Sequence, residues 1–73
     1  MTTEQIRDAA EKAAKLVPCI KYEIETTDNE VIVYDRGFSS MYHPQYFYSI
    51  KCKHQFKVIT RNGKNHVALF LKP

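Results

Sequence analysis

Apolar residues recur at helical spacing near the start of the chain. Between residues 3 and 17 they fall at intervals of three and four, which is the period of one face of an α-helix. Thr2 and Gln5 have the identities and spacing of a capping box, with Thr2 at the N-cap position. Pro18 ends the pattern, because proline disfavours helical geometry at the preceding residue and has no N–H to donate. Most of the apolar face is alanine, so we expect this helix to lie close against a flat surface such as a sheet.

The pattern then changes to the two-residue period of β-strands. Residues 20–26 alternate apolar and polar side chains, which predicts a half-buried strand. Residues 31–35 are apolar and β-branched on both faces, which favours a more central strand, and residues 27–30 separate the two as a turn. Residues 36–46 show no period and contain a glycine, a serine pair and a proline. They predict a loop, and loops of about this length are often functional.

The longest alternating segment covers residues 47–61 and predicts one strand that twists or contains a bulge. Asn62-Gly63 is the dipeptide most typical of a hairpin with a type I′ turn, and residues 66–71 return as a last apolar strand. A chain of 73 residues is too short for a second core, so residues 1–73 predict a single domain. We expect an α+β fold, with one N-terminal helix packed on a mostly antiparallel four-stranded sheet.

Several less polar side chains are assigned to the interior. A core this small needs aromatic rings, so we expect Phe38, Tyr48 and Phe56 to be buried. Cys19 and Cys52 are interpreted as small buried apolar residues.

Charge is divided unevenly along the chain. Residues 1–36 hold all eight acids and five bases, whereas residues 37–73 hold six bases and no acid. This asymmetry indicates an anionic partner for the basic half. The alternative is that the halves neutralise each other in the fold, for instance if strand pairing sets Glu23 and Glu25 against the lysines of residues 51–53.

The bases of the longest strand repeat at even spacing. Residues two apart on a strand share a face at about 6.6–6.8 Å, a pitch at which lysines can follow a phosphate backbone. A lysine-rich strand face is also an ordinary solvated surface that protects a sheet edge. The candidate binding residues on the strand and the hairpin tip are Lys51, Lys53, Lys57, Arg61 and Lys64.

Aromatic residues cluster just before this strand. Tyr42 and Tyr46 are the candidate binding residues here: each is either a core ring or an exposed ring that can stack on the bases of single-stranded nucleic acid. Tyrosine is equally favoured as an anchor at protein–protein interfaces.

No pattern of residues indicates catalysis. Two glycines cannot make a glycine-rich phosphate loop, Cys52 has no acid nearby to orient a histidine partner, and the pair Glu23 and Glu25 lies on an exposed strand face. We therefore expect no enzymatic activity, no small-molecule substrate and no cofactor. The potential metal ligands lack the paired spacing of zinc sites, so no metal site is expected: Cys19, Cys52, His54 and His66.

The composition also bears on location. No stretch approaches the roughly 18 apolar residues of a membrane span, and the first fifteen residues lack the apolar region of a secretory signal. Two cysteines are too few for a disulfide scaffold, so we expect a cytoplasmic protein with reduced thiols and no membrane partner.

These features predict a small non-enzymatic binding protein. In the first hypothesis the surface of residues 47–64 binds nucleic acid or a nucleic-acid-processing assembly. In the alternative, the chain is a phage- or viral-type regulator or inhibitor. It would bind the acidic surface of a host protein, such as RNA polymerase or a nuclease, through the aromatic loop 36–46 and the basic face. A homodimer with acidic and basic halves in contact is a third possibility. The first two require the cations to be contiguous and uncovered.

Overall fold

The helix begins where the capping box predicts it. The structure is a computed structural model that describes all 73 residues, and its helix α1 spans Thr3–Lys15. The Thr2 hydroxyl accepts a hydrogen bond from the Gln5 N–H at 3.2 Å, and the Gln5 side-chain oxygen accepts one from the Thr2 N–H at 2.9 Å. The helix ends two residues before the predicted end. There the hydrogen bonding changes to the tighter 3₁₀ pattern, in which the Val17 N–H donates to the Ala14 carbonyl three residues back.

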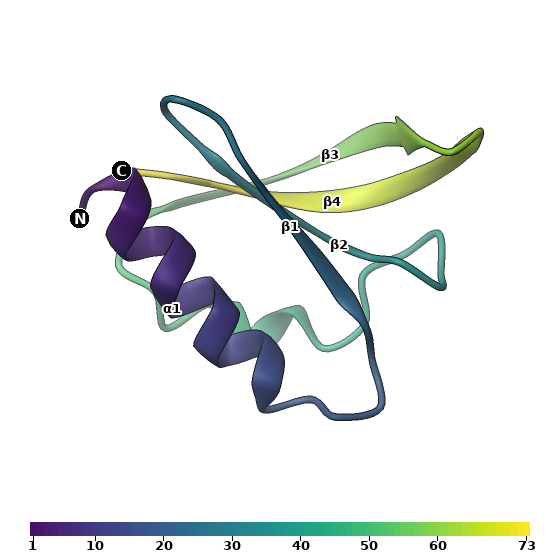
Figure 1. Cartoon of the computed structure of the whole chain (residues 1–73), viewed down its shortest axis with the longest axis horizontal. Helices are drawn as coiled ribbons and strands as arrows, with labels where there is room; N and C mark the ends of the chain where they lie inside the picture. Colours follow the sequence, from purple (N-terminus) through teal and green to yellow (C-terminus); the bar gives the residue numbers. More distant parts are fainter.

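The alternating segments form one antiparallel sheet. Its strands are β1 (Tyr22–Thr26), β2 (Val31–Asp35), β3 (Lys53–Arg61) and β4 (Lys64–Lys72), in the order β1-β2-β4-β3. The β1–β2 hairpin crosses the β3–β4 hairpin steeply, and α1 lies on one side of both (Figure 1). The α+β class, with one helix on a four-stranded antiparallel sheet, is therefore confirmed.

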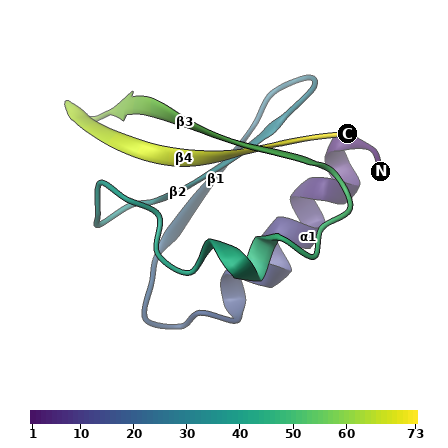
Figure 2. The same cartoon turned by 180° about the vertical axis from the view of Figure 1, so that it is seen from behind.

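The prediction of one strand over residues 47–61 is wrong in its first third. The chain instead forms a 3₁₀ helix, η1 (Pro44–Phe47), then a turn, and β3 starts only at Lys53. Phe47 and Ile50 are both buried and lie three residues apart, and the Ile50 N–H donates to the Phe47 carbonyl at 3.2 Å. Burying both side chains on one side requires a helical spacing, which a strand with its period of two does not provide. This segment lies beside α1 on the same side of the sheet (Figure 2).

The predicted hairpin turn is confirmed. Asn62 and Gly63 have φ angles of 53° and 75°, the left-handed values that a type I′ turn requires at both central positions. The two-residue turn sets Arg61 directly opposite Lys64. For this reason β4 starts at Lys64, two residues before the predicted start at His66.

The main core lies between α1, η1 and the sheet. The alanines of α1 allow a close approach to the sheet, as expected, and α1 packs on β1, β2 and β4. The buried side chains of this core are Ile6, Ala10, Ala13, Val31, Val33, Met41, Phe47, Ile50, Leu69 and Leu71. A smaller cluster lies on the opposite face of the sheet and contains Ile32, Tyr34, Ala68 and Phe70.

Four of the burial predictions are wrong. Phe38, Tyr48 and Phe56 are between 45% and 54% exposed, and Cys19 is exposed as well. Phe47 is instead the phenylalanine of the main core between α1 and the sheet. The helix covers three strands, which leaves the ring of Phe56 on β3 partly open to solvent.

Candidate functional site

The sheet face opposite α1, called the outer face below, takes alternate residues of β3 and β4. Leu69 and Leu71 belong to the main core beneath α1, so the residues on either side of them point the other way. Residues directly opposite in an antiparallel ladder share a face, which assigns the side chains of β3 as well. The outer face therefore presents Lys53, Lys57, Arg61, Lys64 and Lys72.

These cations face each other at both ends of the β3–β4 hairpin. Lys53 is directly opposite Lys72, and Arg61 is directly opposite Lys64. Like charges at directly opposed positions destabilise a sheet. Between the two pairs, the Lys57 ammonium lies 4.9 Å from the centroid of the Phe70 ring, a cation–π arrangement. The hairpin thus has opposed cations at each end and one more in the middle.

The net charge of the protein resides on the sheet and its connecting segments. Helix α1 carries three acids and three bases, and so contributes nothing to the formal net charge of +3. Helix α1 and the segment from η1 to β3 lie on the other side of the sheet (Figures 1 and 2), and loop 36–46 contacts the outer face at His66, through the Phe38 carbonyl. The four lysines of the outer face are exposed to solvent: Lys53, Lys57, Lys64 and Lys72.

Acids from the other hairpin neutralise part of this charge. The Arg61 guanidinium makes two hydrogen bonds to the Glu25 carboxylate, at 2.8 and 2.6 Å. Hydrogen bonding from Arg61 holds the pKa of Glu25 below its usual range, and the same carboxylate raises the pKa of Arg61. Glu30 lies 3.7 Å from the Lys72 ammonium. The possibility that the two halves neutralise each other is realised in part, at these positions.

Three lysines of the outer face have no acidic partner. Lys53, Lys57 and Lys64 form no salt bridge. Lys64 lines a polar cavity of about 280 Å³ with Arg61, Arg36, His66 and Glu23, whose carboxylate lies 3.5 Å from Arg36. Of these, Arg36 and His66 were not identified from the sequence as site residues. The alternation of β4 assigns His66 to this face once the register is known, but Arg36 follows the end of β2 and only the fold places it there.

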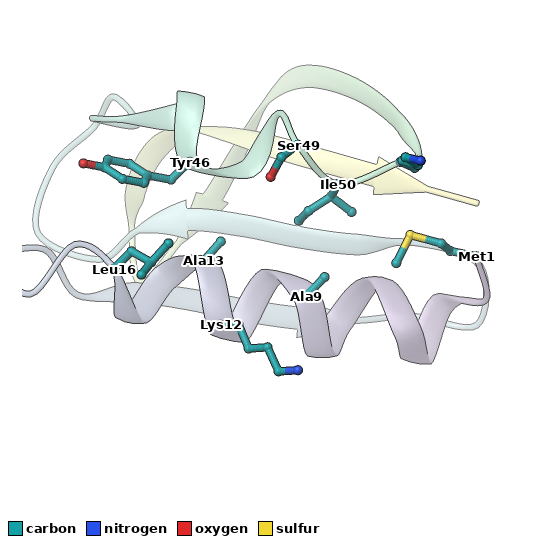
Figure 3. Close-up of a pocket in the computed structure, with 9 residues that line it drawn as sticks. Met1, Ala9, Lys12, Ala13, Leu16, Tyr46, Ser49 and Ile50 are labelled. Atoms are coloured by element: carbon teal, nitrogen blue, oxygen red, sulfur yellow. The ribbon is translucent and has the colours of Figure 1, made fainter.

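Lys51 does not belong to the outer face, so its predicted place on one strand with the other cations is wrong. It lies in the turn before β3, because the chain is not extended there. With Tyr46 it lines a shallow groove of about 520 Å³ between α1 and the segment after η1. In Figure 3, Ile50 points across this groove toward the helix and Lys12 points away from it. The groove is mostly apolar, and no acid lines it.

The two predicted aromatic residues lie apart from the outer-face cations. Of the two alternatives, the structure has Tyr42 and Tyr46 exposed, but both lie on the helix side of the sheet. Tyr42 packs edge-to-face on Phe38, with ring centroids 5.2 Å apart, and its carbonyl accepts a hydrogen bond from the Tyr22 hydroxyl. A ligand on the outer face therefore has no contact with these rings.

The aromatic rings that do lie on the outer face are buried. Tyr34 and Phe70 pack in the smaller cluster, beneath the charged side chains. Burial and the nearby Glu25 carboxylate raise the pKa of Tyr34, so its hydroxyl stays protonated. The His66 ring packs 5.0 Å from the Tyr34 ring and lies within hydrogen-bond distance, 2.9 Å, of the Phe38 carbonyl. The outer face offers cations, amides and the carboxylates of Glu23 and Glu25, but no open ring for base stacking.

One cysteine and one histidine side chain lie close together before and in β3. The Cys52 sulfur lies 3.9 Å from the His54 Nε2, and burial raises the pKa of this half-buried thiol. A raised pKa lowers the fraction of thiolate, which is the nucleophilic form. No group of three or more His, Cys, Asp or Glu side chains is close enough to hold a metal ion.

Comparison with known proteins found no matching family model, no similar curated protein and no similar solved structure. None of the helices combines the length and the apolar character that crossing a bilayer requires. The functional proposal therefore depends on the geometry of the outer face.

Proposed function

We propose that this protein is a non-enzymatic binding protein whose outer face holds the phosphate backbone of a nucleic acid. The observation that carries the proposal is the set of three exposed lysines on the outer face that have no acidic partner, Lys53, Lys57 and Lys64. In each opposed pair of the β3–β4 hairpin one cation is held by an acid, Arg61 by Glu25 and Lys72 by Glu30. The other cation, Lys64 or Lys53, is left for an external anion.

An extended polyanion fits this arrangement better than a single small anion. From Lys53 to Arg61 the strand spans about 27 Å, at roughly 3.4 Å per residue. Cations at both ends and in the middle of that length match a ligand with repeated negative charge. Because the rings on this face are buried, the contacts go to phosphates and carry little sequence information.

The salt dependence of binding tests the proposal. Three unpaired lysines on a DNA duplex predict a log–log slope of affinity against salt of about −3, from roughly 0.9 released ions per contact. Fluorescence anisotropy with a labelled duplex, between low and moderate salt, measures this slope. An affinity that does not change with salt would exclude backbone binding.

Single substitutions locate the interface. Lys57→Gln is expected to weaken binding at low salt and to make the slope less steep by about 0.9, while the protein stays folded. Lys12→Gln is the matched control, because Lys12 is an exposed lysine of α1 that forms no salt bridge and lies on the other side of the sheet. Equal losses in the two variants would mean that the contacts are not made by the outer face.

The alternative of a regulator that binds a host protein through loop 36–46 and the basic face stays a prediction. Tyr42 and Tyr46 lie on the helix side, so one flat partner surface cannot contact them together with Lys57.

A further inference from the structure

Strand β3 forms an open edge of the sheet. Its one neighbour is β4, and no other strand pairs with its far side. In an antiparallel ladder, alternate residues direct their N–H and C=O groups away from the neighbour, so β3 presents a row of unpaired backbone groups. The strand has nine residues, and the six from Lys53 to Val58 are all exposed. An edge of this length and exposure is a ready template for another strand.

The helix side of this edge is apolar. Phe56 lies opposite Leu69 and Val58 lies opposite Val67, which places both side chains on the side that carries α1. Yet Phe56 is 45% exposed and Val58 is 66% exposed. Exposed apolar residues that stand together at a strand edge indicate a surface that a partner covers.

The outer side of the same edge is cationic. Lys53, Lys57 and Arg61 alternate with the residues that face the helix side. Lys53 and Lys57 have no acidic partner within the protein. The edge therefore has two chemically different sides along one length of backbone.

We infer that β3 accepts a fifth strand, contributed by an extended segment of a partner protein in which acidic and apolar side chains alternate. The acidic side chains of that segment lie beside Lys53 and Lys57, and its apolar side chains lie beside Phe56 and Val58. Backbone hydrogen bonds supply affinity, and the alternation supplies specificity. This inference goes beyond nucleic-acid binding and does not require it, although both use Lys53 and Lys57.

A second copy of this chain fits the edge less well than an acidic segment. In a fully overlapped antiparallel pair of β3 strands, Lys57 lies opposite Lys57 of the other copy, and Lys53 lies opposite Arg61. Like charges at directly opposed positions are unfavourable, whereas an acidic segment turns each of them into an opposite-charge pair.

Peptide titration followed by NMR tests the inference. The probe is a nine-residue peptide of alternating glutamate and valine, added to the ¹⁵N-labelled protein. We expect saturable chemical-shift changes along β3 and slower hydrogen exchange of its outward amides. The absence of saturable changes on β3 would overturn the proposal.

N-methylation of the peptide separates strand addition from simple charge attraction. Two further peptides carry methyl groups on one or the other set of alternate amides, so their charge and side chains are identical. Only one set faces β3, so we expect one methylated peptide to lose about tenfold or more in affinity and the other to bind as before. Equal binding of the two would show charge attraction alone and would contradict the inference.

Variants of the protein complete the test. Val58→Thr keeps the β-branched shape and is expected to lower the affinity for the peptide about two- to fivefold. DNA binding is expected to be unchanged, because Val58 is not on the outer face. If the wild-type protein bound the peptide but not DNA, the proposed function would fail and the strand-addition proposal would not, so the two failures are distinguishable. Sedimentation that shows a dimer with β3 protected would assign the edge to a second copy and overturn the proposal.

Discussion

At the residue scale, neighbouring aromatic side chains have opposite environments. Phe47 is fully buried and touches Tyr22 edge-to-face at 5.2 Å, whereas the next residue, Tyr48, is mostly open to solvent and contacts the His54 ring. The sequence contains three consecutive aromatic residues at 46–48 and gives no local reason to prefer one of them for the core.

This contrast makes a stability prediction. Phe47→Ala removes a fully buried ring and is expected to destabilise the protein by about 3–5 kcal/mol. Tyr48→Ala removes an exposed ring from the adjacent position and is expected to cost less than about 1 kcal/mol. Chemical denaturation of both variants checks the difference. Similar losses would mean that Tyr48 also contributes to the core.

At the element scale, the β3–β4 hairpin was predicted best and the start of β3 worst. The turn depends on two adjacent residues and their own backbone preferences, so the dipeptide is sufficient to identify it. The conformation of the region before β3 depends on the space that remains beside α1 on the helix side of the sheet. Its alternating sequence is compatible with a strand, but burial of Phe47 and Ile50 together favours a 3₁₀ helix and a turn.

The hairpin turn can be tested with its glycine. Gly63 has a φ of 75°, where a side chain is strained even though nothing lies within 4 Å of its added Cβ. Gly63→Ala is therefore expected to cost about 1–2 kcal/mol. Gly37→Ala is the matched control, because its φ is not positive and its new Cβ lies at an ordinary 3.8 Å from the Asp35 carboxylate. Thermal unfolding of the two variants should show a loss only for Gly63→Ala.

At the scale of the whole molecule, one ion pair joins strands at opposite edges of the sheet. Glu25 belongs to β1 and Arg61 to β3, 36 positions apart in the chain. The steep crossing of the two hairpins lets their side chains meet over the outer face (Figure 1). The pair removes one cation from the candidate interface and ties the two hairpins together.

This ion pair predicts a pH dependence of stability. Its hydrogen bonds hold the folded-state pKa of Glu25 below the ordinary value of 4.5, so the stabilisation is present above pH 4.5 and is lost as the pH falls through the folded-state pKa. Glu25→Gln should lower the thermal midpoint at pH 7, and the gap to the wild type should shrink as the pH falls below 4.5. Melting curves from pH 7 to pH 3 measure the gap. A constant gap over that range would contradict this assignment.

The candidate site was predictable only in part. Lys53, Lys57, Arg61 and Lys64 lie on one face as the strand period predicts, because they follow the part of the segment that is a strand. Lys51 does not, because the chain turns before β3. The separation of the tyrosines from these lysines was not predictable, since it depends on which side of the sheet loop 36–46 crosses.

The sequence by itself determined the features that depend on short-range physics. These are the capped helix, the turn at Asn62-Gly63, the alternation of the strands and the α+β class, each set by backbone preferences and hydrophobic period within a few residues. The tertiary structure alone decided which aromatic ring occupies the core, which cations acquire an acidic partner, and which strand edge stays open. Those outcomes depend on competition for one limited volume and on the order of strands in the sheet, which bring together residues far apart in the chain.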